Sequence, residues 1–183
     1  MAKRPLRIYH AAPLFSTPEL MYNIMNVKKL RAEGFACFNP QDHALVGNSA
    51  DPAFRQQIHD DDHLALAECD VCVAYLEGVE PDSGTIIEVG IAHEMGKPVY
   101  GIRADRRTYC DPVVKVNVMV LGCLVNATTY ECVEDIIPML HEEEKHLEDK
   151  PEPRCDMYAT ADYHTRELDE LIVTKETGEV KSY

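Results

Sequence analysis

The sequence predicts an α/β fold, a doubly wound parallel sheet with helices on both faces. Three observations favour this class. Short apolar runs typical of strands alternate with longer segments in which apolar residues recur at helical spacing. The run 71–76 is continuously apolar, as in strands buried on both faces. The 183 residues are enough for one domain that buries roughly two-thirds or more of the surface exposed when unfolded.

The first strand and the first helix are separated by a proline. Leu6–Ala12 alternates and then becomes apolar, which predicts a strand that ends before Pro13. Ser16 is a residue type that caps helices, and Glu19 supplies an acid in the first turn. Apolar residues then recur at helical spacing as far as Gly34, where we expect the helix to end.

The middle of the chain repeats this alternation. We expect a second strand at Phe35–Phe38 and, after a polar loop, a second helix from about Pro52 to Ala67. The third strand is the apolar run 71–76. A third helix, Gly84–Met95, is followed by a Gly-Lys-Pro stop and by a fourth strand at Val99–Arg103.

The apolar segment Val116–Val125 predicts a fifth strand, and residues 130–147 predict a last helix. This order is typical of a flavodoxin-like sheet, in which five parallel strands bind ligands beyond their carboxyl ends. Residues 1–148 make up the predicted domain. The Lys-Pro-Glu-Pro segment that begins at Lys150 cannot continue a helix. Residues 149–183 are therefore expected to be a polar tail, either wrapped on the domain or mobile.

Composition restricts the partners. The net charge of −14 repels phosphate backbones and anionic lipid, so we expect neither nucleic acid nor a membrane surface as a partner. No window approaches the ~20 apolar residues of a membrane span, and the first residues do not resemble a signal peptide. The seven cysteines are odd in number and lie mostly in apolar runs, which is typical of reduced thiols. A cytoplasmic location is therefore expected.

The segment from Pro81 to Gly90 is the most informative for chemistry. Asp82 ends a loop, and Glu88 falls on the second turn of the following helix, where it would face the carboxyl edge of the sheet. Gly84 and Gly90 leave room for a ligand there. A plainer interpretation makes Asp82 a helix-capping acid and Glu88 a solvent-facing side chain.

A second acidic group lies between His59 and His63. These histidines share a helix face, but no glutamate stands between them as in helical zinc sites, so a solvated charged surface is favoured. Asp62 differs, because its helix can bring it near the carboxyl edge of the sheet. Cys69 and Cys72 have the spacing of redox or zinc sites, but without a second pair we interpret them as structural thiols. We predict no metal and no cofactor, since no nucleotide-cofactor motif is present.

Two carboxylates beside a sugar permit glycosidic chemistry. One attacks the anomeric carbon while a protonated partner assists the leaving group. The residues of this chain resemble the nucleoside 2-deoxyribosyltransferases and their relatives that hydrolyse nucleotide N-glycosidic bonds. The resemblance covers residues 6–140. It rests on Ile8–Ser16, on Asp62 eight residues before Asp70, on Asp82–Gly90 and on Asn117–Met119.

The resemblance implies a role for each matching side chain. Glu88 would be the nucleophile that forms a covalent deoxyribosyl-enzyme, and Tyr9 would orient its carboxylate. Asp62 and Asp82 would hold the nucleoside and assist protonation of the departing base, and the two tasks are not apportioned between them.

Further residues would bind the substrate. Asn117, with Met119 nearby, matches a segment that a neighbouring subunit inserts into the site to contact the 5′ end of the sugar. The resemblance thus implies a homo-oligomer, either a dimer or a trimer of dimers. Phe15 would line the base pocket, and Ser83 and Gly84 are the remaining substrate-binding candidates.

The function expected from the resemblance is transfer of 2-deoxyribose between nucleobases in nucleotide salvage, by a retaining ping-pong mechanism. The substrates would be 2′-deoxynucleosides and free nucleobases. One alternative is a hydrolase of the N-glycosidic bond of (deoxy)nucleoside 5′-monophosphates. Another is a non-catalytic nucleotide-sensing module, since this fold does not by itself imply activity.

Overall fold

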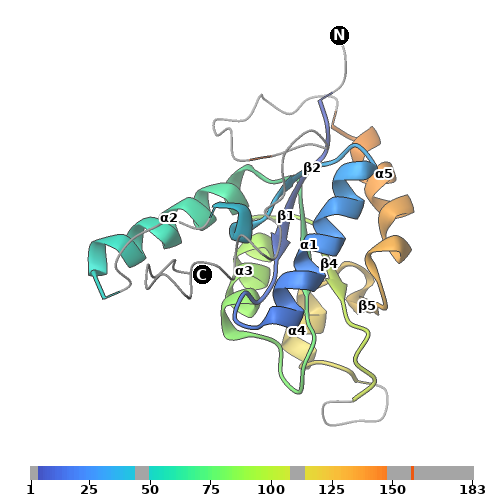
Figure 1. The fold of residues 1–183 in the computed structure, drawn as a ribbon. Coiled ribbons are helices and arrows are strands. Elements are labelled where there is room, and N and C mark those ends of the chain that lie inside the picture. Colours follow the sequence, from blue (N-terminus) through green and yellow to red (C-terminus); the bar gives the residue numbers. More distant parts are fainter. Residues whose placement is uncertain (1–3, 44–49, 108–113, 148–157, 159–183) are drawn as a thin grey trace.

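A single parallel sheet forms the centre of the molecule. The structure, a computed structural model, describes residues 4–43, 50–107, 114–147 and 158. The strands lie in the order β2-β1-β3-β4-β5, which confirms the predicted fold class (Figure 1). Their bounds are β1 Arg7–Ala11, β2 Ala36–Phe38, β3 Val71–Tyr75, β4 Val99–Ile102 and β5 Thr129–Tyr130. The order reverses between β1 and β3, and such sheets bind ligands at the carboxyl ends flanking that point.

Helices cover both faces of the sheet. One face carries α1 and α5, and the other carries the end of α2 together with α3 and α4 (Figure 1). The helices are α1 Thr17–Ala32, α2 Pro52–Glu68, α3 Ser83–Glu94, α4 Val118–Cys123 and α5 Ile137–Lys145. Single turns of 3-10 helix occur at Pro40–His43, Val125–Ala127 and Val133–Asp135. None of the helices in the described ranges is long and apolar enough to span a membrane.

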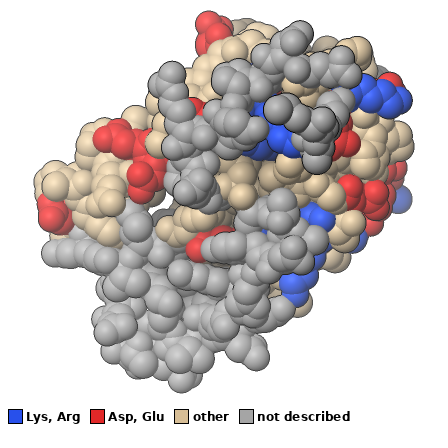
Figure 2. All heavy atoms as spheres, turned by 90° about the horizontal axis from the view of Figure 1, so that it is seen from above, with Lys and Arg blue, Asp and Glu red and all other residues tan. Residues whose placement is uncertain are grey.

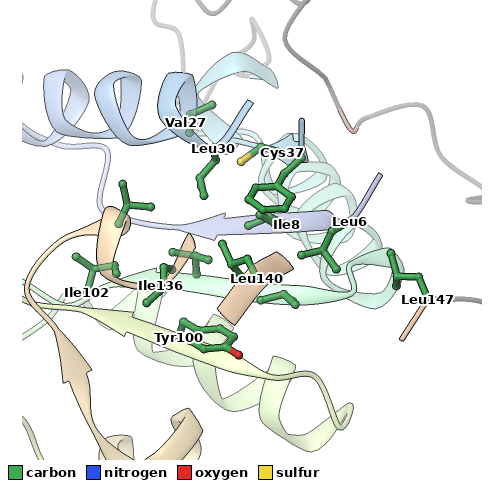
Figure 3. Close-up of a cluster of buried hydrophobic side chains, with 14 residues drawn as sticks. Leu6, Ile8, Val27, Leu30, Cys37, Tyr100, Ile102, Ile136, Leu140 and Leu147 are labelled. Carbon is green, nitrogen blue, oxygen red and sulfur yellow. The ribbon is translucent and has the colours of Figure 1, made fainter. Parts of the chain in front are cut away.

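The core between α1, α5 and the sheet is aliphatic. Figure 3 shows Val27 and Leu30 of α1 facing Ile8 of β1. Leu140 of α5 and Ile136, which directly precedes that helix, belong to the same cluster. These side chains are almost completely shielded from water. Burial of each of these side chains stabilises the fold by about 1.5–3 kcal/mol. Because the helix is held by this burial, the spacing of its apolar residues in the sequence predicts the bounds of α1 closely.

The predicted fifth strand at Val116–Val125 is wrong. The side chain of Asn117 accepts a hydrogen bond from the backbone nitrogen of Met119 at 2.9 Å and so starts α4. None of the residues of α4 is buried, whereas Val116 before it and Leu124 after it are buried. The apolar run is therefore a short helix with exposed apolar side chains, and the fifth strand follows it.

The last predicted helix, residues 130–147, is shorter than expected. A 3-10 turn precedes it and α5 begins only at Ile137, with Pro138 in its first turn. The predicted tail, 149–183, lies outside the described residues except for Tyr158. The side chain of Tyr158 packs against the core on the α3 side of the sheet.

Candidate active site

The central contact of the site joins a strand to a helix. The hydroxyl of Tyr9 on β1 donates a hydrogen bond to Oε1 of Glu88 on α3, with the two oxygens 2.6 Å apart. Tyr9 is completely buried, and Glu88 lies largely beneath the surface. The alternative in which Glu88 faces solvent is therefore wrong. A short bond to a carboxylate stabilises its ionised form and fixes its orientation.

The environment of Glu88 disfavours charge. Burial raises the pKa of Glu88 to about 8. The hydrogen bond from Tyr9 opposes this rise, while the nearby charges of Asp62 and Asp82 add to it. Burial also raises the pKa of Tyr9 well above its usual value, so the phenol keeps its proton and remains a donor.

Asp62 is the second carboxyl group of the site. It lies on α2 and is partly buried, whereas Asp60 two residues earlier is exposed. Burial raises the pKa of Asp62 to about 6, and the adjacent charge of Asp61 contributes. A carboxyl group with such a pKa can hold a proton near neutral pH and deliver it to a leaving group.

Asp82 begins α3. Its Oδ2 accepts hydrogen bonds from the backbone nitrogen of Thr85 at 2.9 Å and from the Thr85 hydroxyl at 3.3 Å. The predicted capping role is thus confirmed. Ser83 and Gly84 are exposed beside it. A Cβ at Gly84 would lie 3.1 Å from Asp82 Oδ2, so glycine leaves this carboxylate uncrowded.

Four predicted residues lie near one another, since Tyr9 contacts Glu88, the charge of Asp62 acts on both, and the charge of Asp82 acts on Glu88. Three further predicted substrate contacts, here called the rim residues, are exposed. Asn117 caps the start of α4 and Met119 lies on it, and Phe15 lies between β1 and α1. Phe15 is 67% and Met119 78% exposed, which leaves both available to a ligand or a partner.

The remaining chemical candidates are two histidines on α2 and two thiols, of which Cys72 lies beside Tyr9 on the neighbouring strand. His59 and His63 are exposed with their rings stacked 5.9 Å apart, on a helix whose acidic surface is visible at the left of Figure 2. No group of three or more residues able to hold a metal occurs in the ranges that the structure describes. Cys69 and Cys72 are buried free thiols, which confirms their interpretation as structural residues.

Some residues beside the site were missed. Phe38 of β2 stacks on Tyr9 with ring centroids 5.2 Å apart, and His43 stacks on the other side of Phe38 at 4.7 Å. Asn39 and Gln41 are fully buried, and their side-chain amides have no hydrogen-bond partner in the described structure. Sequence reasoning assigned neither amide a role in binding. The signal was their place directly after β2, at the carboxyl edge where the sheet binds ligands.

Comparison with known proteins gives a family match over most of the chain. The family described as nucleoside 2-deoxyribosyltransferase matches residues 8–161. This match agrees with the resemblance drawn from the sequence. None of the curated proteins compared with the chain matches it significantly.

Solved structures share the fold. A 2-deoxyribosyltransferase from the psychrotolerant bacterium Bacillus psychrosaccharolyticus is 22% identical with a TM-score of 0.61, covering 73% of this chain and 95% of that one. A conserved protein from Enterococcus faecalis V583 is 25% identical with a TM-score of 0.62, covering 78% and 99%. A 2-desoxiribosyltransferase from Leishmania mexicana is 20% identical with a TM-score of 0.59, covering 75% and 98%.

Proposed function

The chain belongs to the nucleoside 2-deoxyribosyltransferase family, and we propose that it transfers 2-deoxyribose between nucleobases through a covalent deoxyribosyl-Glu88 intermediate. The observation that carries the proposal is the 2.6 Å hydrogen bond from Tyr9 to a largely buried Glu88, with two further carboxylates close enough to affect its pKa. The substrates are 2′-deoxynucleosides and free nucleobases.

In the first half-reaction a carboxylate oxygen of Glu88 attacks C1′ of the deoxyribose. The bond between C1′ and the base nitrogen breaks, and its electron pair stays on the base. Asp62 delivers a proton to the departing base, a role that its raised pKa supports. Tyr9 keeps the carboxylate in place through its hydrogen bond to Oε1 of Glu88.

In the second half-reaction another base attacks C1′ of the glycosyl ester. It approaches from the face that the first base left, Glu88 departs as a carboxylate, and the incoming base returns a proton to Asp62. Two inversions give net retention. The cycle needs no change in oxidation state and consumes no other reactant.

Asp82 and the buried amides serve in binding. Oδ2 of Asp82 is engaged by Thr85, which suits this carboxylate to hold the nucleoside rather than to exchange protons. The amides of Asn39 and Gln41 offer both donors and acceptors for the edge of a nucleobase. Phe15, Ser83 and Gly84 complete the binding surface of one chain.

A second copy of the chain completes the site. The exposed α4 carries Asn117 and Met119 toward the neighbouring subunit, where Asn117 contacts the 5′-hydroxyl of the sugar. Val118 on the same helix is 62% exposed, so α4 offers an apolar surface for such a contact. The protein is therefore a homo-oligomer, a dimer or a larger assembly built from dimers.

Hydrolysis is the second candidate reaction. The exposure of Phe15 and Met119 shows that the rim of a single chain is open to water. Water reaching the glycosyl ester would release free deoxyribose, and transfer requires a site that excludes it. A hydrolase of nucleoside 5′-monophosphates would need cationic or hydroxyl groups for the phosphate, which the net charge of −14 opposes.

A base-exchange assay tests the proposal. The protein is incubated with a 2′-deoxynucleoside and a second free base, and new nucleoside, free base and free sugar are measured. We expect exchange in the wild type and its loss in Glu88→Ala, whereas Glu94→Ala, an exposed glutamate on the same helix, keeps full activity.

Each alternative predicts a different result in this assay. A preference for the 5′-monophosphate with release of sugar indicates the hydrolase. Thermal stabilisation by nucleosides without any turnover indicates the sensing module. Absence of exchange in the wild type, or full activity in Glu88→Ala, refutes the transferase.

A further inference from the structure

Helix α2, which carries Asp62, is anchored at its last turn. Among its residues only Ala65 and Leu66 are buried, and all seventeen lie in the described ranges. In Figure 1 the remainder of the helix projects away from the body of the molecule. Asp62 precedes this turn, so its position relative to Glu88 depends on how firmly the anchored end is held.

Tyr158 forms a hydrogen bond to α2 close to Asp62. Its hydroxyl donates a hydrogen bond to the carbonyl oxygen of Ala65, with the oxygens 2.6 Å apart. Ala65 lies three residues after Asp62 and therefore on the same side of the helix. The ammonium group of Lys97 also donates a hydrogen bond to the last turn of α2, to the carbonyl oxygen of Ala67 at 2.9 Å. Ala67 is farther from Asp62 along the chain than Ala65 is.

The ring of Tyr158 reaches the strands beside Tyr9. The guanidinium of Arg7 on β1 lies 5.8 Å from its centroid. The ring of Phe38 on β2 lies 6.0 Å away and is tilted by 48°. Phe38 stacks on Tyr9, and Tyr9 donates its hydrogen bond to Glu88. A continuous set of contacts thus leads from Tyr158 to the nucleophile.

We infer that Tyr158 is a positioning residue of the active site. Its hydroxyl holds the end of α2 and so places Asp62, and its ring supports Phe38 and so fixes the tilt of Tyr9. The inference rests on the proposed function, since it concerns residues of the same site. This tyrosine of the C-terminal segment then belongs to the catalytic unit, whereas the sequence left open whether that segment is wrapped on the domain or mobile.

Two substitutions separate the contributions of the hydroxyl and the ring. Tyr158→Phe removes the bond to Ala65 and keeps the ring contacts, whereas Tyr158→Ala removes both. Tyr130→Phe and Tyr130→Ala are matched controls, because Tyr130 is also partly buried but lies on β5 at the far edge of the sheet.

The first readout is the base-exchange rate. We expect kcat to fall about threefold to tenfold in Tyr158→Phe and about tenfold to a hundredfold in Tyr158→Ala, with little change in KM, because small displacements of reacting groups are costly. The Tyr130 variants should stay within about twofold of the wild type. Melting curves confirm that each variant is folded.

A second readout does not depend on activity. Amide hydrogen exchange of residues 62–68 should become faster in both Tyr158 variants and stay unchanged in the Tyr130 variants. If the wild type exchanges bases while both Tyr158 variants match it in kcat and in amide exchange, this inference is wrong and the proposed function survives. If the wild type catalyses no base exchange, the proposed function fails, and amide exchange still decides whether Tyr158 holds α2.

Discussion

Glu88 is held in surroundings that favour its protonated form. Burial raises its pKa from 4.5 to about 8, so the folded protein retains a proton that the unfolded chain releases at lower pH. The stability from this proton is fully present below about pH 4.5 and is lost as pH rises through about 8. At a pH where Glu88 is ionised and able to attack, its buried charge therefore lowers the free energy of unfolding.

Replacing this carboxyl group should stabilise the protein. Glu88→Gln keeps an oxygen that can accept the bond from Tyr9 but carries no charge. We expect the variant to match the wild type near pH 4.5 and to be more stable at pH 8 by up to about 4 kcal/mol, because each unit of pKa shift corresponds to about 1.4 kcal/mol. Urea unfolding at both pH values measures this, with Glu94→Gln as the control. Equal stability of Glu88→Gln and wild type at pH 8 would refute the assigned pKa shift.

The Asp62–Glu88 pair predicts a bell-shaped pH profile. The reactive form has a proton on Asp62 and a charge on Glu88, and the pair holds one proton between about pH 6 and pH 8. Below this window both groups are protonated and Glu88 cannot attack, and above it neither holds a proton and Asp62 has none to give. Within it the reactive form is the minor arrangement, in which the single proton lies on Asp62 rather than on Glu88. We expect kcat/KM for a deoxynucleoside to be greatest near the middle of the window.

Removing the charge of Asp62 should change both limbs of this profile. In Asp62→Asn the alkaline limb disappears, because the acid is gone, and the remaining activity is at least about tenfold lower. The acidic limb then follows the ionisation of Glu88 alone, so its midpoint moves up from about pH 6. It stays below about pH 8, because the charge of Asp62 no longer raises the pKa of Glu88. The exposed Asp60→Asn is the control. An unchanged profile in Asp62→Asn would exclude Asp62 as the acid.

The residue that caps helix α3, Asp82, combines a structural and a chemical role. Asp82→Asn keeps a side chain that caps helices equally well, whereas Asp82→Ala loses the bond to Thr85. We expect Asp82→Ala to lose about 1 kcal/mol of stability and Asp82→Asn almost none. Base exchange should fall in both variants. Full activity in Asp82→Asn would limit Asp82 to its capping role.

The elements differ in how far the sequence determines them. The predicted bounds of a helix lie within one or two residues of the observed ones where a capping residue and the apolar spacing indicate the same start, as in α1 and α3. The strand prediction for Val116–Val125 is wrong because the apolar residues of this segment resemble those of a buried strand. Its helical start depends on one hydrogen bond from the Met119 nitrogen to the Asn117 side chain, and its apolar side chains are exposed.

The site was predictable in part for a related reason. Asp82 caps a helix that the sequence places at the carboxyl edge of the sheet, Glu88 falls on the second turn of that helix, and Tyr9 lies on the first strand beside it. The contacts of Phe38 and Tyr158 join segments far apart in the chain, and such pairings leave no periodic signal in a single sequence. Burial of Glu88 is likewise a property of the assembled fold, and its pKa follows from that burial.

At the scale of the whole molecule, the proposal of a shared site predicts complementation. Glu88→Ala and Asn117→Ala chains should each be inactive or nearly so. In a mixed dimer one site carries both substitutions and the other carries neither. After random exchange of equal amounts, half of the dimers are mixed and each has one intact site, so about a quarter of wild-type activity should return.

The control for this experiment places both substitutions in one chain and mixes it with the Glu88→Ala chain. No intact site can then form, because neither chain supplies an unchanged Glu88, and activity should stay at the background level. Failure of the first mixture to regain activity, with subunit exchange verified by native mass spectrometry, would show that Asn117 acts within its own chain.

The covalent role of Glu88 is tested most directly by trapping the intermediate. A 2′-deoxy-2′-fluoro nucleoside slows the breakdown of a glycosyl ester, because fluorine disfavours positive charge at C1′. Intact-protein mass spectrometry should show one added fluorodeoxyribosyl group per chain with release of one base, and peptide fragmentation should locate the group on Glu88. No added mass in a wild type that exchanges bases, or a label on another residue, would contradict the account.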